Sequence, residues 1–203
     1  PLLRPPPRDR LSVAFRQVVA DMYALLTARP PTISRPLGPP VARRLRHVST
    51  NVLAGLLETV AAAPYGGRAD LPEVAEDVQL EANEFLPAAE ALQMLGLAEL
   101  AEGDIVLTTG GREYADADMQ ERKRIFSERL LSCVPLVAHI RGILATRPNQ
   151  QAPRVRFEAE LEDHLSEQYA RETLNAAIEW GRYAELFAYD DQSEWFSLED
   201  VTA

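Results

Sequence analysis

The apolar positions between Leu71 and Gly111 predict two short helices followed by a β-hairpin. One stripe has the i, i+3, i+4, i+7 spacing of a helix face: Leu71, Val74, Ala75 and Val78. A second helical stripe follows, in which Pro87 is tolerated if it falls in the first turn: Phe85, Ala88, Ala89, Leu92 and Leu95. We expect Gly96 to end this helix, and Ala98–Leu100 and Ile105–Leu107 to form strands around the turn Glu102-Gly103-Asp104. Helix, turn, helix and hairpin in this order predict a winged helix.

A similar order of elements recurs in the C-terminal part of the chain. A helix is predicted to begin at Pro135 and to stop before Pro148, followed by a loop over Asn149–Pro153. Two further helices are expected over Val155–Leu165 and Ser166–Trp180, the second ended by Gly181. A hairpin is then predicted to open at Tyr183–Leu186 and to close through Trp195–Leu198. We interpret the two series as two winged helices in tandem.

The predicted fold class is therefore mainly α with small β-hairpins (α+β), with tandem winged-helix domains joined by a long helix. The predicted segments are a helix at 12–27 within residues 1–28, a Pro/Arg-rich linker at 29–48, a first winged helix at 49–113, a connecting helix at 114–134 and a second winged helix at 135–203. Ser49 or Thr50 is expected to cap the first helix of the globular part, and Asp70 with Glu73 resembles a capping box. The linker is expected to be a semi-rigid spacer. The alternative is a basic tether along anionic lipid or an acidic partner surface.

Charge is divided unevenly along the chain. Residues 1–47 contain nine arginines and only two acidic residues, whereas the remainder contains 12 basic and 29 acidic residues. Because phosphate neutralisation dominates nucleic-acid binding, an acidic globular part argues against a nucleic-acid partner. The two candidate recognition helices, 83–95 and 168–180, agree with this: the first has no cation, and Arg171 in the second is surrounded by Glu167, Glu172 and Glu179. No run of about 18 apolar residues predicts a membrane span.

No catalytic, cofactor-binding or metal-binding residues are predicted in this chain. The phosphate-binding pattern G-x-x-x-x-G-K-[ST] is absent. Cys133 is the single cysteine and is expected to be buried and inert, and His47 and His139 have no companions at ligand spacing. We interpret the acidic cluster of Glu158, Glu162, Asp163 and His164 as a solvated helix face. The basic run Arg122-Lys123-Arg124 is expected to form ion pairs along its helix, and Trp180 and Trp195 are expected to pack beneath the second wing.

Several segments of the chain together resemble a known family. These are GGRADLPEVAEDVQLE, GLAELAEGDIVLTTGGREYADADMQERKRIF, VPLVAHI and EDHLSEQYARETLNAAIEWGRYAELFAYDD, spread over about residues 49–199. They resemble the AAA-associated C-terminal domain appended to some ATP-binding subunits of nitrate/sulfonate/taurine-type ABC importers. Residues 1–27 also resemble the end of such an ATPase, through Pro7–Arg10 and Tyr23–Thr27. A chain that starts at Pro1 is accordingly expected to be a fragment of a longer protein.

The resemblance implies a non-catalytic regulatory or dimerisation domain, with ATP and Mg bound only in the full-length subunit. The implied partners are the ABC ATPase core, its twin subunit and, through them, a membrane permease; a homodimer is possible and no nucleic acid is expected. The implied location is cytoplasmic and peripheral to the inner membrane. Two alternatives remain open at this point: a winged-helix transcription regulator, and an acidic tandem winged-helix scaffold for protein interactions.

Overall fold

The computed structural model describes residues 40–198, so the predicted helix 12–27 and most of the linker lie outside the described residues. The described chain is mostly helical and contains two small antiparallel sheets of three strands each. It begins with a 3₁₀ turn, η1 (Pro40–Ala42), and an extended segment that leads into the first long helix. The α+β class predicted from the sequence is confirmed at this level.

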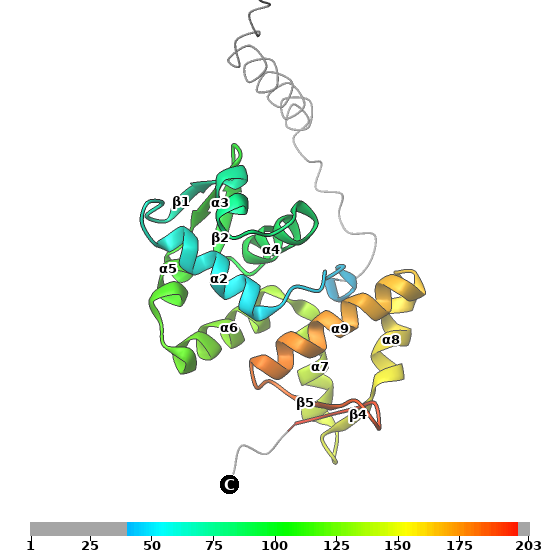
Figure 1. Cartoon of the computed structure of the whole chain (residues 1–203). Helices are drawn as coiled ribbons and strands as arrows, with labels where there is room; N and C mark the ends of the chain where they lie inside the picture. Colours follow the sequence, from blue (N-terminus) through cyan, green and yellow to red (C-terminus); the bar gives the residue numbers. More distant parts are fainter. Residues whose placement is uncertain (1–39, 199–203) are drawn as a thin grey trace, which may run out of the picture. The chain divides into compact units, whose positions relative to one another are not determined.

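Two series of elements follow one another in the same order (Figure 1). The first consists of α2 (Thr50–Ala61), β1 (Arg68–Asp70), α3 (Leu71–Asp77), α4 (Ala82–Met94), β2 (Ala98–Ala101) and β3 (Asp104–Leu107). The second consists of α7 (Pro135–Thr146), β4 (Gln151–Pro153), α8 (Arg154–Glu162), α9 (Glu167–Tyr183), β5 (Ala188–Asp190) and β6 (Trp195–Ser197). Both sheets place the last strand in the centre, in the orders β1-β3-β2 and β4-β6-β5. We call the two series the first and second repeat.

The third strand of each sheet was not predicted. β1 pairs antiparallel with β3, and β4, which falls in the predicted loop Asn149–Pro153, pairs with β6. Each of these strands has three residues and a single buried side chain, Ala69 or Ala152. A strand this short cannot show the alternation of apolar and polar residues by which strands are recognised in a sequence.

The connection between the repeats is two helices, not the one long helix predicted for 114–134. α5 (Thr109–Asp116) and α6 (Met119–Cys133) are separated at Ala117, which is extended, and the side chain of Asp118 caps α6 by accepting from the Glu121 amide. An Asp at this position satisfies a backbone donor at the helix start, which favours beginning a new helix there. The caps predicted at Ser49 and Asp70 are confirmed by acceptor contacts to the amides of Asn51 and Glu73.

Two further details differ from the prediction in the helices that precede the hairpins. Pro87 lies inside α4 and not in its first turn, so the carbonyl of the exposed Asn83 lacks its helical donor. Gly181 does not end α9, which continues to Tyr183. A Cβ at Gly181 would lie 2.2 Å from the Phe187 ring, so this glycine permits close packing within the helix. The second hairpin therefore opens later than predicted, at Ala188, whereas its closing strand at Trp195 is confirmed.

The repeats share one hydrophobic core, in which Phe126 of α6 has a central place. Its side chain is fully buried, and its ring centroid lies 6.5 Å from that of Tyr114 in α5. On α9 its ring meets Trp180 and Tyr183 edge-on, at centroid distances of 6.2 and 5.3 Å. Edge-to-face aromatic pairs stabilise beyond the area that they bury. Phe126 therefore joins the α5–α6 connection to the second repeat.

We expect Phe126→Ala to lower the free energy of unfolding by about 3–5 kcal/mol, because it removes a buried ring and leaves a cavity between the repeats. Urea unfolding followed by circular dichroism measures this change. Met119→Ala is the matched control, since Met119 lies in the same helix and is 71% exposed; its effect should stay within about 0.5 kcal/mol. A loss below about 1 kcal/mol for Phe126→Ala would contradict this role.

Candidate protein-interaction surface

The extended segment Arg43–Val48, which we call the strap, lies on α9 of the second repeat although it precedes the first repeat in the chain. Leu45 and Val48 are buried, with 2% and 6% of their surface exposed. The Leu45 amide donates to Thr173 Oγ1 at 3.3 Å, and the indole Nε1 of Trp180 donates to the Val48 carbonyl at 2.8 Å. The strap is therefore part of the folded domain.

Two basic side chains of the strap, Arg44 and His47, meet acidic side chains of α9. Arg44 pairs with Glu172 at 3.1 Å, and its guanidinium lies 3.7 Å from the ring centroid of Tyr169. His47 lies 2.5 Å from Glu179, which is about two helical turns beyond Glu172 on α9. Hydrogen bonds from Gln168 and Arg44 lower the pKa of Glu172. The described part of the predicted linker thus binds an acidic surface, and that surface belongs to this same chain.

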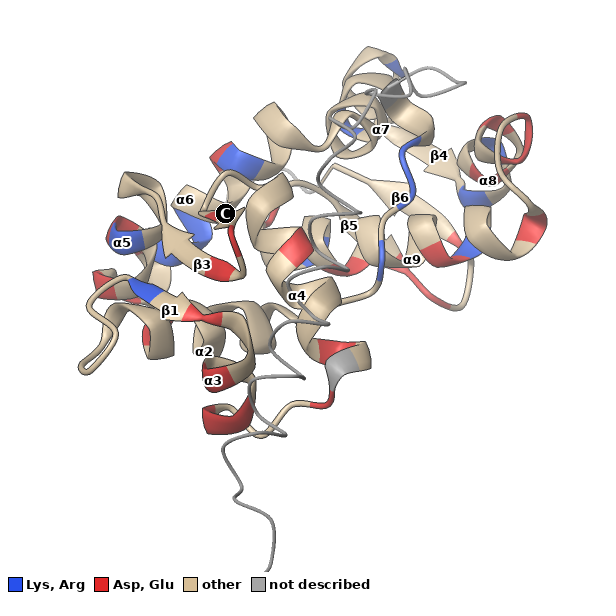
Figure 2. Cartoon of the chain, turned by 90° about the horizontal axis from the view of Figure 1, so that it is seen from above, with Lys and Arg blue, Asp and Glu red and all other residues tan. Residues whose placement is uncertain are grey.

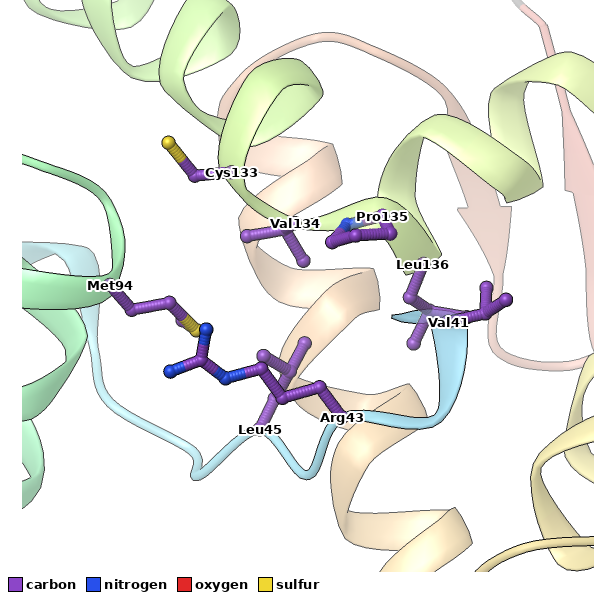
Figure 3. Close-up of a pocket in the computed structure, with 8 residues that line it drawn as sticks. All are labelled: Val41, Arg43, Leu45, Met94, Cys133, Val134, Pro135 and Leu136. Carbon is purple, nitrogen blue, oxygen red and sulfur yellow. The ribbon is translucent and has the colours of Figure 1, made fainter. Parts of the chain in front are cut away.

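A narrow crevice lies between the strap, α4 and the junction of α6 and α7 (Figure 3). It is too narrow to hold a water molecule, and it is lined by Val41, Arg43, Leu45, Met94, Cys133, Val134, Pro135 and Leu136. Cys133 is half-buried, not buried as predicted, and its side chain points away from the other lining residues in Figure 3. The Cys133 Sγ lies 3.7 Å from the Leu95 carbonyl oxygen. The crevice offers no volume for a ligand.

The first repeat presents an anionic surface. Residues 69–111 contain ten acidic residues and no Lys, Arg or His. Figure 2 shows red positions on α3 and α4 and no blue ones. The exposed side chains of α4 include Asn83, Glu84, Glu90 and Gln93, as predicted for the first candidate recognition helix. A duplex nucleic acid would be repelled by this helix.

The basic run Arg122-Lys123-Arg124 is paired within the protein, but only one of its members pairs along the helix as predicted. Arg124 contacts Glu121 and Glu128 of α6. Arg122 pairs with Glu58 of α2 at 2.5 Å and donates to the Tyr114 and Ala115 carbonyls, which end α5. Lys123 pairs with Glu185, which follows α9, at 2.6 Å. This run therefore holds elements together and leaves no free cationic patch.

The acidic cluster of the second repeat is dispersed by the fold. Glu158 is engaged by Arg154 at 3.3 Å and Arg171 at 3.7 Å, whereas Glu162, Asp163 and His164 are exposed. His139, which has no companions at ligand spacing in the sequence, lies 2.7 Å from the single carboxylate of Glu160. Within residues 40–198, no group of three or more His, Cys, Asp and Glu side chains is arranged to hold a metal ion. The interpretation of this cluster as a solvated face accounts for three of its four residues.

The prediction that both tryptophans pack beneath the second wing is wrong. Trp180 is 1% exposed and packs against Phe126 and the strap. Trp195 lies on β6 with 39% of its surface exposed, while Phe196 fills the space beneath the sheet. The reason is the strand alternation: neighbouring residues of β6 point to opposite faces, and Phe196 takes the inner one.

None of the helices in the described part of the chain is by itself long and apolar enough to span a membrane. The consecutive helices α6 and α7 reach that length and composition only as a pair, and they are bent by 94° at their junction.

Comparison with protein families gives one match, the C-terminal AAA-associated domain, over residues 72–190. The chain belongs to this family. No curated protein and no solved structure matches the chain. The AAA-associated domain match begins at the start of α3 and ends with β5, so it is narrower than the resemblance seen in the sequence over about 49–199. The strap, α2, β1 and β6 lie outside it, although the strap and α2 belong to the same core.

In this AAA-associated domain, we expect Leu45→Ala to destabilise the strap by about 2–3 kcal/mol, the lower range for removing a buried leucine. Native-state hydrogen exchange of the residue-45 amide measures strap opening directly, because this amide donates to Thr173. Leu86→Ala is the control, since Leu86 is 50% exposed on α4. Equal exchange rates for residue 45 in the parent chain and Leu45→Ala would show that the strap is not held by this side chain.

Proposed function

We propose that this chain is the non-catalytic C-terminal regulatory and dimerisation domain of the ATP-binding subunit of an ABC importer of the nitrate/sulfonate/taurine class. The observation that carries the proposal is the family match from Pro72 to Asp190. The transporter class rests on the motifs that resemble such subunits, including the ATPase-like segments Pro7–Arg10 and Tyr23–Thr27, which lie outside the described residues. The subunit would act at the cytoplasmic face of the inner membrane, bound to its permease.

The proposal includes two winged helices in tandem as the architecture of the domain. Three observations support it: the repeated order of elements, the matching strand orders, and the placement of α4 and α9 directly before a hairpin. In such a domain α4 and α9 occupy the position of the helix that DNA-binding winged helices present to the major groove. Here α4 carries exposed carboxylates and α9 is covered by the strap. Both features favour protein partners, namely the ATPase core, its twin subunit or a second copy of this domain.

Regulation in this proposal acts through contacts and not through chemistry within the domain. ATP and Mg would bind to the ATPase core of the full-length subunit, since the sequence of this chain contains no phosphate-binding loop. A domain attached to each of two paired subunits is held at high effective concentration near its twin. Even weak contacts between these domains would then bias the equilibrium between the open and closed ATPase pair.

Calorimetry of the isolated chain with Mg-ATP should show no binding at micromolar concentrations, because its sequence contains no phosphate-binding loop. The full-length subunit provides the matching test. Removal of residues 40–203 from the full-length subunit should leave ATP hydrolysis in place but change the hydrolysis rate, because the proposed regulator is removed. Micromolar Mg-ATP binding by the isolated chain, or identical hydrolysis with and without residues 40–203, would contradict the proposal.

Duplex DNA should bind the chain only weakly and without sequence preference at physiological salt, because neither α4 nor α9 offers free cations. An electrophoretic mobility shift titration measures this. A specific shift at nanomolar protein would favour the transcription regulator instead.

A further inference from the structure

A cavity lies in the second repeat, between η1, α7, α8 and the turn that follows α8. Its volume is about 220 Å³. For comparison, a cavity of about 150 Å³ lined by apolar side chains binds a benzene molecule. The cavity beside η1 can therefore take a ring of that size together with a short chain attached to it.

Much of the cavity lining is apolar. Leu136 of α7 and both Phe157 and Leu161 of α8 line it, and at most 3% of the surface of each is exposed. Two wider hollows of the second repeat, of about 390 and 460 Å³, are lined almost entirely by polar and charged side chains. Sites for small ligands are mostly apolar, with a few polar groups that fix the orientation of the ligand. The cavity beside η1 has that composition and the two wider hollows do not.

Four side chains form the polar part of the lining: His139, Glu160, Asp163 and His164. Glu160 is half-buried and held in place from two sides, because His139 Nε2 lies 2.7 Å from one carboxylate oxygen and an Arg156 nitrogen lies 3.3 Å from the other. The His139 ring meets Phe157 edge-on, at a centroid distance of 6.3 Å. The polar groups that adjoin the apolar lining are therefore fixed by packing and by hydrogen bonds.

We propose that this cavity binds a small primary amine with an apolar body, of the size of an arylalkylammonium ion. The apolar body would lie against Leu136, Phe157 and Leu161, whose contacts with it exclude water. The ammonium group has three donors and no acceptor, so it fits the carboxylates of Glu160 and Asp163. A carboxylate or phosphate ligand does not fit, because it would meet these two acidic side chains. The inference goes beyond the proposed function, which assigns no small-molecule ligand to this domain.

Three probes separate the contributions of the ring and of the charge: 2-phenylethylamine, 2-phenylethanol and ethylamine. Each is titrated into the ¹⁵N-labelled chain at up to about 10 mM, a range that covers the weak affinities of very small ligands. We expect 2-phenylethylamine to shift the amide signals of residues 41–42, 139 and 157–164. The alcohol lacks the charge and should bind about fivefold more weakly. Ethylamine lacks the ring and should cause no shift changes.

The same titrations can overturn the proposal. Absence of shift changes at the lining residues with 2-phenylethylamine would show that the cavity is not a binding site for such amines. Equal affinity for the alcohol would show that the carboxylates do not select a cation. Shift changes with ethylamine as large as those with 2-phenylethylamine would show that the apolar lining contributes nothing.

A matched pair of variants separates a specific site from general attraction to an acidic protein. Asp163→Asn should weaken the binding of 2-phenylethylamine about threefold, as expected for the loss of an exposed charge pair, and should leave the binding of 2-phenylethanol unchanged. Glu162→Gln is the control, because Glu162 is the neighbouring exposed carboxylate and does not line the cavity. Equal weakening by the two variants would overturn the proposal. The ATPase-subunit role would still stand, since it does not depend on a ligand in this cavity.

Discussion

The buried indole of Trp180 connects three parts of the chain that are far apart in the sequence. Its Nε1 donates to the Val48 carbonyl of the strap, its ring meets Phe126 of α6, and the residue itself belongs to α9. An unsatisfied buried donor is costly, so the position of the strap and the burial of this indole depend on each other. The repeats and the strap are thereby parts of one folding unit, and its core extends beyond the residues that the family match covers.

The strap shows how part of the basic N-terminal region pairs with the acidic remainder of the chain. Arg44 of the strap is already engaged within the chain, because it is stacked on Tyr169 and paired with Glu172. The three basic residues of α6 likewise form ion pairs within the protein, with Glu58 of α2, Glu121 of α6 and Glu185, which follows α9. In the first repeat, residues 69–111 contain ten acidic residues and no Lys, Arg or His, so this repeat presents negative charge to solvent. This distribution favours partners with basic surfaces over nucleic acid.

Membership of the AAA-associated family, the lack of Lys and Arg on α4, and the ion pairs of Arg171 and Arg182 on α9 all fit a role in binding proteins. Under the function proposed above, the domain would regulate an ATPase by binding to it or to its twin.

The sequence by itself determined most of the helices, the hairpin at Glu102-Gly103 and the caps at Ser49 and Asp70, because these depend on local spacing and on side chains within one turn. It also determined the acidic character of α4. Tertiary structure decided the remainder. Strands β1 and β4 exist because a neighbouring strand completes their hydrogen bonds. Gly181 lies inside α9, where the Phe187 ring packs too close for a larger side chain, and the strap is held by its contacts with α9. The exposed side of α4 was decided in the same way, because the other side of the helix is buried in the core.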